Sequence, residues 1–367
     1  DAEVVSKIVA SQAHHKKIDG HAPGLQGKDL DTYVAAGVYS DHECATMEDA
    51  LAKLQRGQFI MIREGTAARN LEALAPLLTP QYAERCMFCT DDKHPSDLLE
   101  KGHIDYIARE AINKYGVDPI IAVKAACHHA SRYFLLNNRG AIAPGYLADF
   151  AVIDNFKDFN VEMVFKKGVL YWNNGELRDF EAPKIEEYLD KRAHDTFHVS
   201  TLTPDDFRDT RQRGVLGMVP GEIITTDNGY ADHVDLEKDI LKIAVVERHK
   251  GTHHIGLGYI QGYGLKSGAV ATSISHDSHN IIVVGTNSAD MAFAANYIVE
   301  HHGGIVVVEN GTVKGSVVLE IAGIMSDRPL TEVNDQLEAA KDAAFTLGVS
   351  RGIDPFMTLS FMALPVI

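Results

Sequence analysis

Between residue 16 and about residue 115, short apolar segments alternate with amphipathic segments. This alternation is typical of βα units arranged around a parallel sheet. Each predicted strand is followed by a predicted helix, so we expect a run of consecutive βα units. The predicted strands are Lys17–His21, Val38–His42, Gln58–Arg63 and Arg85–Thr90.

The helix expected after the second strand has the strongest local signals. Thr46 and Asp49 have the spacing of a capping box, and Ala50 and Leu54 belong to an apolar stripe at helical period. A further helix is expected over Pro119–Phe134, after which the pattern changes.

Beyond Gly140 the apolar segments become short, rich in β-branched or aromatic residues, and separated by turn residues. This pattern predicts an antiparallel sheet. Its expected strands are Phe150–Ile153, Val161–Phe165 and Val169–Trp172.

The charged stretch Glu181–Asp206 contains two prolines and predicts a linker or an exposed helical connection. A third kind of composition follows it, in which apolar runs flank a helix expected over Ala289–His301. The apolar runs are Ile240–Val246, Ile281–Val284 and Ile305–Val308. A separate α/β or α+β domain is therefore expected after the linker.

The 367 residues carry a formal net charge of −16, with 45% hydrophobic and 23% charged residues, as in ordinary globular proteins of two or three domains. The negative charge repels polyanions, so neither nucleic acid nor an anionic membrane is an expected partner, and a small uncharged substrate fits better. No run of about 18 apolar residues and no leader is recognisable, so we expect a cytoplasmic protein. The four cysteines predict no disulfide framework, and the CxxC pair Cys86 and Cys89 is best interpreted as part of a buried strand.

Three of the predicted parallel strands end in a potential metal ligand, namely His21, His42 and Asp91. The carboxyl ends of strands in a (β/α) barrel converge on one mouth, so residues far apart in sequence meet there. Neutral imidazoles suit zinc, iron or manganese, and a carboxylate can both bind a metal and accept a proton from water. A single histidine is more often a structural residue, but its repetition at successive strand ends favours a metal site.

Residues 140–150, Gly-Ala-Ile-Ala-Pro-Gly-Tyr-Leu-Ala-Asp-Phe, resemble the segment through which amidohydrolase-superfamily chains leave the barrel and enter a small β-sandwich. Within that superfamily the sequence resembles the adenine deaminases across nearly its whole length. The stretches that carry this resemblance are residues 19–25, 61–70, 89–92, 102–105 and 275–280.

The resemblance implies the second half of a (β/α)8 metal-dependent hydrolase barrel, a small β-sandwich, and a C-terminal α/β or α+β domain. The expected division is half of the barrel over 1–139, the β-sandwich segment over 140–182, a linker over 183–205, and an adenine-deaminase-type domain over 206–367. A homo-oligomer is the expected assembly.

The activity implied by the resemblance is hydrolysis of adenine to hypoxanthine and ammonia by metal-activated water, in purine salvage. His21 and His42 then bind metal, while Asp91 binds metal and shuttles the proton. The implied cofactor is a pair of divalent metal ions, manganese or iron, with zinc as an alternative.

Five further residues are candidates for substrate binding, each with a structural alternative. Arg63 and Glu64 stand at a strand end and could orient substrate, although an internal ion pair is equally compatible with the sequence. His276, Asp277 and His279 could reach the active site, or could belong to a polar covering loop or a domain interface.

The sequence departs from the complete family pattern at its beginning. Neither the His-x-His of the first barrel strand nor the bridging carboxylate near the fourth precedes residue 18, and the segment Ala2–Ala13 is too short for four βα units. We therefore expect half of a barrel that requires a missing N-terminal half as its partner. The alternatives are a non-catalytic half or subunit, and a different deaminase of the amidohydrolase superfamily.

Overall fold

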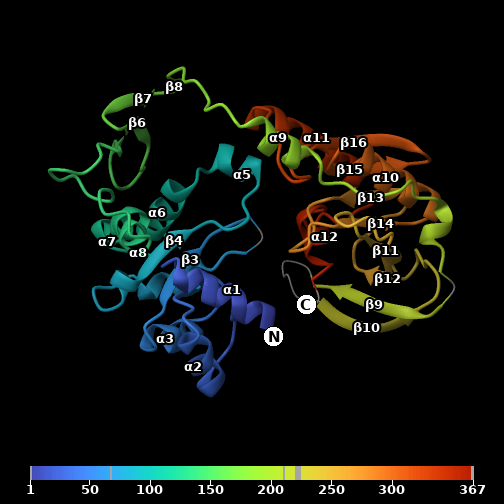
Figure 1. The fold of residues 1–367 in the computed structure, drawn as a ribbon, viewed down its shortest axis with the longest axis horizontal. Helices are drawn as coiled ribbons and strands as arrows, with labels where there is room; N and C mark the ends of the chain where they lie inside the picture. The colour runs from blue at the N-terminus through green and yellow to red at the C-terminus, as the bar shows by residue number, and fades with distance from the viewer. Residues whose placement is uncertain (1, 67, 210, 220–224, 365–367) are drawn as a thin grey trace. The chain divides into compact units, whose positions relative to one another are not determined.

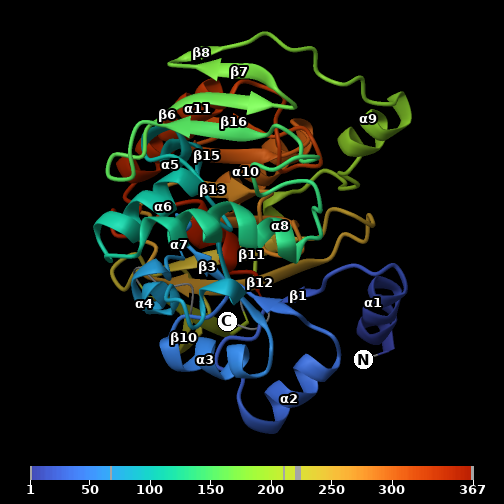
Figure 2. The ribbon, with the colours of Figure 1, turned by 90° about the vertical axis from the view of Figure 1, so that its left-hand side faces the viewer.

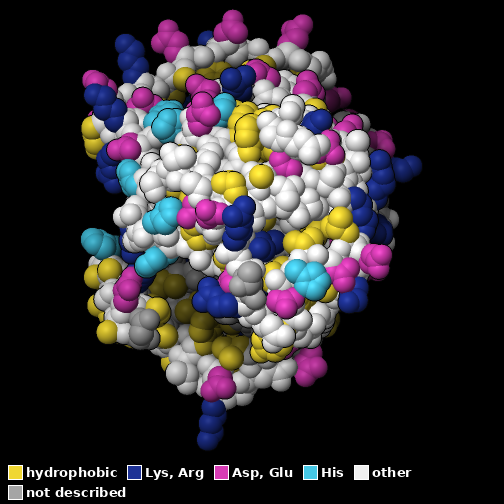
Figure 3. Space-filling view, turned by 90° about the vertical axis from the view of Figure 1, so that its right-hand side faces the viewer, with side chains coloured by type: hydrophobic (Ala, Val, Ile, Leu, Met, Phe, Trp, Pro, Cys, Tyr) yellow, Lys and Arg dark blue, Asp and Glu magenta, His cyan; other side chains and the backbone are white. Residues whose placement is uncertain are grey.

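The computed structural model describes residues 2–364, except residues 67, 210 and 220–224 (Figure 1). The chain divides into two compact units, Asp1–Ala182 and Pro183–Ile367. No helix within the described ranges has the length and apolar character needed to cross a membrane. Acidic and basic side chains are interspersed on the face drawn in Figure 3.

The first unit contains a parallel sheet whose neighbouring strands follow one another in sequence, in the order β1-β2-β3-β4. Its strands are β1 (Asp19–Gly20), β2 (Ser40–Asp41), β3 (Phe59–Arg63) and β4 (Cys86–Cys89). All four predicted strands are confirmed, although β1 and β2 are shorter than expected. A hydrogen bond of 2.9 Å from the Tyr39 N–H to the Ile18 carbonyl continues the β1–β2 pairing by one residue.

One helix precedes the first parallel strand, and helical segments follow each parallel strand. They are α1 (Ala2–Ala13), α2 (Gly27–Ala35), α3 (Met47–Gln55), α4 (Leu71–Leu74), η1 (Ala75–Leu77), η2 (Ala83–Arg85), α5 (Pro95–Glu100), α6 (Ile104–Asn113), α7 (Pro119–Val123), η3 (Lys124–His128) and α8 (His129–Tyr133). The predicted cap of α3 is confirmed, since the Thr46 side chain accepts the Asp49 N–H at 3.2 Å. The helix predicted over Pro119–Phe134 is also present, with the π-helical turn η3 between α7 and α8.

The core of the first unit forms between the sheet and its helices. Ile60 and Ile62 on β3 are fully buried, as are Ile107 and Ala111 on α6. Figure 2 shows α2 and α3 at one end of this unit and the strands β6, β7 and β8 at the other.

The antiparallel sheet predicted beyond Gly140 is confirmed, with strand order β5-β6-β7-β8. Its strands are β5 (Phe150–Ile153), β6 (Val161–Lys166), β7 (Val169–Asn173) and β8 (Glu176–Leu177). The charged segment that follows contains α9 (Glu187–His194), none of whose residues is buried. This agrees with an exposed helical connection.

The second unit is built on an eight-stranded sheet of order β10-β9-β12-β11-β14-β13-β15-β16, in which only the described pair β9–β12 is parallel. Its strands are β9 (Arg213–Met218), β10 (Thr225–Ala231), β11 (Ile240–Val246), β12 (Ile255–Gln261), β13 (Ala269–Thr272), β14 (Ile281–Gly285), β15 (Gly304–Glu309) and β16 (Thr312–Val318). Its helices are η4 (Pro204–Phe207), α10 (Ser288–Glu300), α11 (Leu330–Thr346) and α12 (Met357–Phe361). Of the two architectures left open by the sequence, the largely antiparallel sheet corresponds to α+β.

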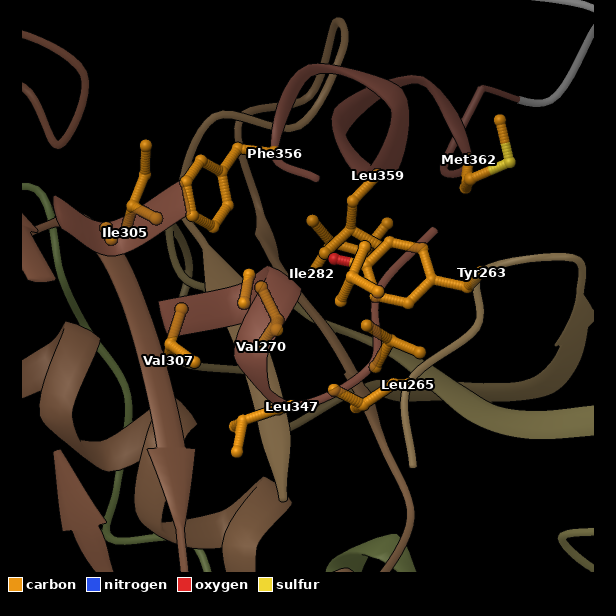
Figure 4. Close-up of a cluster of buried hydrophobic side chains, with 14 of the residues drawn as sticks. Tyr263, Leu265, Val270, Ile282, Ile305, Val307, Leu347, Phe356, Leu359 and Met362 are labelled. Carbon is orange, nitrogen blue, oxygen red and sulfur yellow. The ribbon is translucent and has the colours of Figure 1, made fainter. Parts of the chain in front are cut away.

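Apolar side chains fill both faces of this sheet, because alternate residues of each strand point to opposite sides. On β13, Val270 joins the cluster that includes residues of α11 and α12, whereas Ala269 and Ala271 join the cluster that includes residues of α10. Figure 4 shows part of the first cluster, with Tyr263, Leu265, Val270, Ile282, Ile305, Val307, Leu347, Phe356, Leu359 and Met362 labelled. The buried Tyr263 hydroxyl donates to the Pro355 carbonyl at 2.8 Å, so this polar atom is satisfied inside the core.

Candidate active site

Two imidazoles meet at the ends of the first two parallel strands. His21 directly follows β1 and His42 directly follows β2, and the pairing of Gly20 with Asp41 places the two strand ends side by side. The ring centroids of the histidines are 4.4 Å apart, at an interplanar angle of 78°. The side chain of His42 is 13% exposed and that of His21 is 68% exposed. The structure therefore brings together two of the histidines singled out in the sequence, one largely enclosed and one open to solvent.

Glu43 completes a cluster with these histidines. Its Oε1 lies 3.4 Å from His21 Nδ1 and 3.6 Å from His42 Nε2. One potential ligand atom from each of the three residues lies within 4.8 Å of the others. Two imidazoles and a carboxylate suit a divalent transition metal. The sequence analysis did not single out Glu43, although its position directly after His42 at a strand end was a usable signal.

Asp19 on β1 reaches across to the second strand and holds His42. Its Oδ2 lies 2.7 Å from His42 Nδ1, and its Oδ1 accepts a hydrogen bond of 2.6 Å from Ser40 Oγ. When Nδ1 donates to the carboxylate, Nε2 of His42 carries the lone pair that can bind a cation. Asp19 thus orients the ring and selects its tautomer.

This contact shifts the pKa of both partners. The hydrogen bond to Asp19 raises the pKa of His42, and burial opposes the rise only in part. Burial raises the pKa of Asp19, but hydrogen bonds from His42 and Ser40 outweigh it and hold that pKa below its ordinary value. The carboxylates of Asp91 and Glu43 add to the rise at His42. The site therefore favours positive charge at this imidazole, and a metal ion that binds there displaces a proton.

Arg63 connects the cluster to Asp91. Arg63 is the last residue of β3 and is 4% exposed. Its Nη1 donates to Glu43 Oε1 at 2.6 Å and to Asp91 Oδ2 at 2.7 Å. Asp91 lies two residues beyond β4 and has a left-handed backbone, with φ of 52°. Side chains from the ends of all four parallel strands thus share one network.

Glu64 has a different partner from Arg63. Its Oε2 accepts the Leu71 N–H at 3.3 Å, and burial raises its pKa. The ion pair left open by the sequence exists for Arg63, with Glu43 and Asp91 as the carboxylates. Burial lowers the pKa of Arg63, but these two carboxylates more than compensate, so the guanidinium stays charged.

His276, Asp277 and His279 lie in the second unit, between β13 and β14. His276 Nδ1 is 3.1 Å from Asp277 Oδ1, and the His276 ring stacks on Phe361 with centroids 4.6 Å apart. The ring centroids of His276 and His279 are 6.1 Å apart. Burial, together with the neighbouring His276, lowers the pKa of His279. Within the described part of the chain, none of these three residues belongs to the ligand cluster of the first unit.

The CxxC pair is part of a strand rather than a reactive site. Cys86 and Cys89 are the first and last residues of β4, and Cys86 is fully buried. Burial raises the pKa of each thiol to about 12, so neither is a thiolate near neutral pH. The interpretation as a buried strand is confirmed.

Comparison with known proteins yields two family matches. Residues 1–171 match the amidohydrolase family, and residues 221–367 match the adenine deaminase C-terminal domain. The chain is 44% identical to an adenine deaminase of Desulfatibacillum aliphaticivorans, over 100% of this chain and 65% of that protein. It is 43% identical to an adenine deaminase of Dehalococcoides mccartyi, over 99% of this chain and 64% of that protein. A crystal structure of a β-aspartyl dipeptidase from Fervidobacterium islandicum aligns with a TM-score of 0.40 and 18% identity, over 49% of this chain and 53% of that one.

The imidazoles at parallel strand ends and the match over residues 1–171 define the first unit as amidohydrolase-like. The second match and the relatives that align with the full chain narrow this class, because residues 221–367 match the adenine deaminase C-terminal domain and the chain is similar along its length to adenine deaminases. It spans 65% of the length of its relative from Desulfatibacillum aliphaticivorans.

Proposed function

We propose that this chain contributes to an adenine deaminase that converts adenine and water to hypoxanthine and ammonia. The observation that carries this proposal is the cluster of His21, His42 and Glu43 at adjacent parallel strand ends, with Arg63 and Asp91 beside it. The identities of 41–44% to adenine deaminases along the chain support adenine as the substrate.

The partner we propose is the N-terminal half of a (β/α)8 barrel. Among the described residues, β1 pairs only with β2 and β4 pairs only with β3, so both edges of the sheet carry unpaired backbone groups. Parallel strands that neighbour one another in sequence order are the arrangement of such a barrel. An N-terminal half would pair with both edges and supply the remaining metal ligands.

The donor set fits a divalent cation. His21 and His42 would hold it through imidazole nitrogens, with Glu43 as the nearest carboxylate. When bound, such a cation supplies a polarised water that is nucleophilic at neutral pH. Manganese and iron are our preferred candidates, with zinc as the alternative. In a binuclear site, Asp91 would hold the second cation together with the N-terminal half.

Asp91 is the proposed proton shuttle. The water oxygen forms a bond to the ring carbon that bears the amino group, and the bond from this carbon to the amino nitrogen breaks. Asp91 accepts a proton from the water and delivers it to the departing nitrogen, which leaves as ammonia. Arg63, whose Nη1 is 2.7 Å from Asp91 Oδ2, holds the carboxylate in position for both transfers.

Purine binding is assigned to residues near these strand ends and to the second unit. Arg63 ends β3 beside the cluster, and Glu64 follows it. For His276, Asp277 and His279 the proposed contact with substrate rests on the resemblance of residues 275–280 to the family. We also propose that residues 140–182 form a β-sandwich segment, residues 183–205 a linker and residues 206–367 an adenine-deaminase-type domain. The proposed protein is a cytoplasmic homo-oligomer that acts in purine salvage.

Metal content and ammonia release from adenine test this proposal in the protein that carries the chain. His42→Ala should remove about one metal equivalent and abolish most deamination, because the imidazole is a proposed ligand. His14→Ala is the matched control, since His14 is exposed and lies in a turn outside the cluster. Equal metal content and equal activity in both variants would contradict the assignment.

The second candidate is a non-catalytic half that only completes an assembly, and the unpaired sheet edges favour it. Under that alternative, the assembled protein releases no ammonia from adenine and His42→Ala still assembles normally. Release of ammonia from another purine or cyclic amide, but not from adenine, would instead indicate a different deaminase of the same superfamily.

A further inference from the structure

A buried ion pair lies next to the cluster of His21, His42 and Glu43. Asp41, the last residue of β2, and Lys53 on α3 are both 0% exposed, and Lys53 Nζ lies 3.2 Å from Asp41 Oδ2. Two charges removed from water are often no more stabilising than apolar residues of the same volume. The pair therefore points to a role other than stability.

The Asp41 carboxylate joins the two chain segments that carry the histidines. Its Oδ2 accepts the N–H of Ala22 at 3.0 Å, and its Oδ1 accepts the N–H of Glu43 at 2.7 Å. Ala22 directly follows His21, and Glu43 directly follows His42. One carboxylate thus fixes the backbone on the C-terminal side of both imidazoles.

Lys53, which lies on α3, also bonds to Ala22. Its Nζ donates to the Ala22 carbonyl at 2.7 Å and to Asp49 Oδ2 at 3.0 Å. Ala22 is therefore held through its N–H by Asp41 and through its carbonyl by Lys53. The ammonium also pairs with the Asp41 carboxylate, which accepts the two backbone hydrogen bonds.

We propose that Asp41 and Lys53 are positioning residues that set the separation of His21 from the His42–Glu43 pair and thereby tune metal affinity. This inference rests on the proposed function, because it takes these three residues as metal ligands. Asp41 and Lys53 lie outside the ligand cluster and act through the backbone of Ala22 and Glu43. Residues that support metal ligands in this way typically change metal affinity or activity by about 10- to 100-fold.

Asp41→Asn tests the proposal in the protein that carries this chain. The amide nitrogen of asparagine cannot accept a hydrogen bond, so either the Ala22 or the Glu43 contact is lost while the side-chain volume is kept. We expect the dissociation constant for Co²⁺, measured by chelator competition, to rise about 10- to 100-fold. The visible absorption of bound Co²⁺ should also change, because the ligand geometry changes.

Asp49→Asn is the matched control, because Asp49 contacts the same ammonium and is 4% exposed but has no hydrogen bond to either histidine segment among the described residues. It should destabilise the fold to a similar extent and leave the Co²⁺ affinity and spectrum unchanged. If Asp41→Asn and Asp49→Asn bind Co²⁺ equally tightly with equal spectra, the positioning role is overturned.

A double variant keeps the test decisive if Asp41→Asn does not fold. Asp41→Asn with Lys53→Met removes both charges together, and it should show the same weakened Co²⁺ binding and altered spectrum. Wild-type binding in this double variant would overturn the proposal. Failure of the proposed function looks different, because the wild-type protein itself would then bind no Co²⁺ that depends on His42 and would release no ammonia from adenine.

Discussion

Several buried charges of the first unit form ion pairs, whereas two buried charges of the second unit, Arg248 and Asp290, bond mainly to the backbone. In the first unit, Asp41, Lys53 and Arg63 each form ion pairs with other side chains at the strand ends that carry the imidazoles. In the second unit, Arg248 and Asp290 bond largely to backbone groups. Similar burial therefore accompanies two different arrangements.

Arg248 is an example of a buried charge that bonds mainly to backbone carbonyls. It is 2% exposed, and it donates to the carbonyls of Thr196 and Ala322, each at 2.9 Å, and to the carbonyl of His279. Its guanidinium also lies 4.3 Å from the ring centroid of Phe197. Burial lowers its pKa to about 10. Arg248 thus ties together three segments distant in sequence.

Asp290 also bonds to backbone groups, but to fewer segments than Arg248. As a first-turn residue of α10 it accepts the N–H groups of Asn310 at 3.2 Å and Gly311 at 2.8 Å. A buried charge that has backbone groups as its main partners fastens loops, whereas Asp41 and Lys53 bond to the backbone and also pair with each other beside the imidazoles. In this chain the presence of an ion pair, rather than burial, distinguishes the two arrangements.

The largest expected effect is a loss of turnover on substitution of Asp91, which pairs with Arg63 in the first unit. Asp91→Asn should lower kcat for adenine by about 10²-fold or more, because the proposed proton transfer needs a basic oxygen. Steady-state kinetics of the assembled enzyme measure this. Asp92→Asn is the neighbouring control and should have a much smaller effect. Near-wild-type turnover of Asp91→Asn, with inactive Asp92→Asn, would reverse the assignment within the pair.

Arg248 should show the opposite behaviour, with a large change in stability and none in metal binding. Arg248→Met leaves several backbone carbonyls without a donor, so the free energy of unfolding should fall by about 2–4 kcal/mol. Urea unfolding measures this, with metal content as the second readout. The control Arg208→Met removes an ion pair with Asp205 in which both side chains are exposed, and it should cost less than about 1 kcal/mol. Loss of metal in Arg248→Met would break the proposed distinction.

The smallest expected effect is on the pH dependence of the unfolding free energy, measured after removal of metal. It arises from the contact between Asp19 and His42. Because the pKa of His42 is raised from 6.5 in the folded state, the contact stabilises fully below that ordinary value, and its contribution is lost as the pH rises through the raised pKa. At the acid end the contribution is lost as the pH falls through the lowered pKa of Asp19, below 3.8.

Asp19→Asn should flatten this pH dependence of the unfolding free energy. The change should be below about 1 kcal/mol, because the Asp19 side chain is partly exposed and solvent screens the contact. Denaturant unfolding at a series of pH values measures it. An unchanged pH profile in the variant would show that His42 takes its raised pKa from other groups.

The hydrophobic pattern predicted most of the elements that position the site, because each parallel strand is an apolar run followed by an amphipathic helix. His21, His42 and Asp91 could be singled out because each follows such a run. Their partners could not, since the pairing of Asp19 with His42 depends on the register between two strands.

The burial of Lys53 could not be predicted from the sequence either. Its partners include the carbonyl of Ala22, 31 residues earlier in the chain, and nothing in the local pattern of α3 marks this lysine as buried. Arg248 also has partners from three separate segments and carries no local signature. Contacts set by chain topology are not encoded in the periodicity of any single element.

The parallel pairing of β9 with β12 has a consequence for how the second unit forms and opens. Val215 pairs with Tyr259, so β9 can join the sheet only after the intervening chain has been ordered, and closing such a loop costs conformational entropy. At the edge, β10 pairs with β9 and presents Tyr230 at 75% exposure. In native-state amide exchange, β9 and β10 should therefore exchange at lower opening free energies than β11, β14 and β13, which lie inside the sheet.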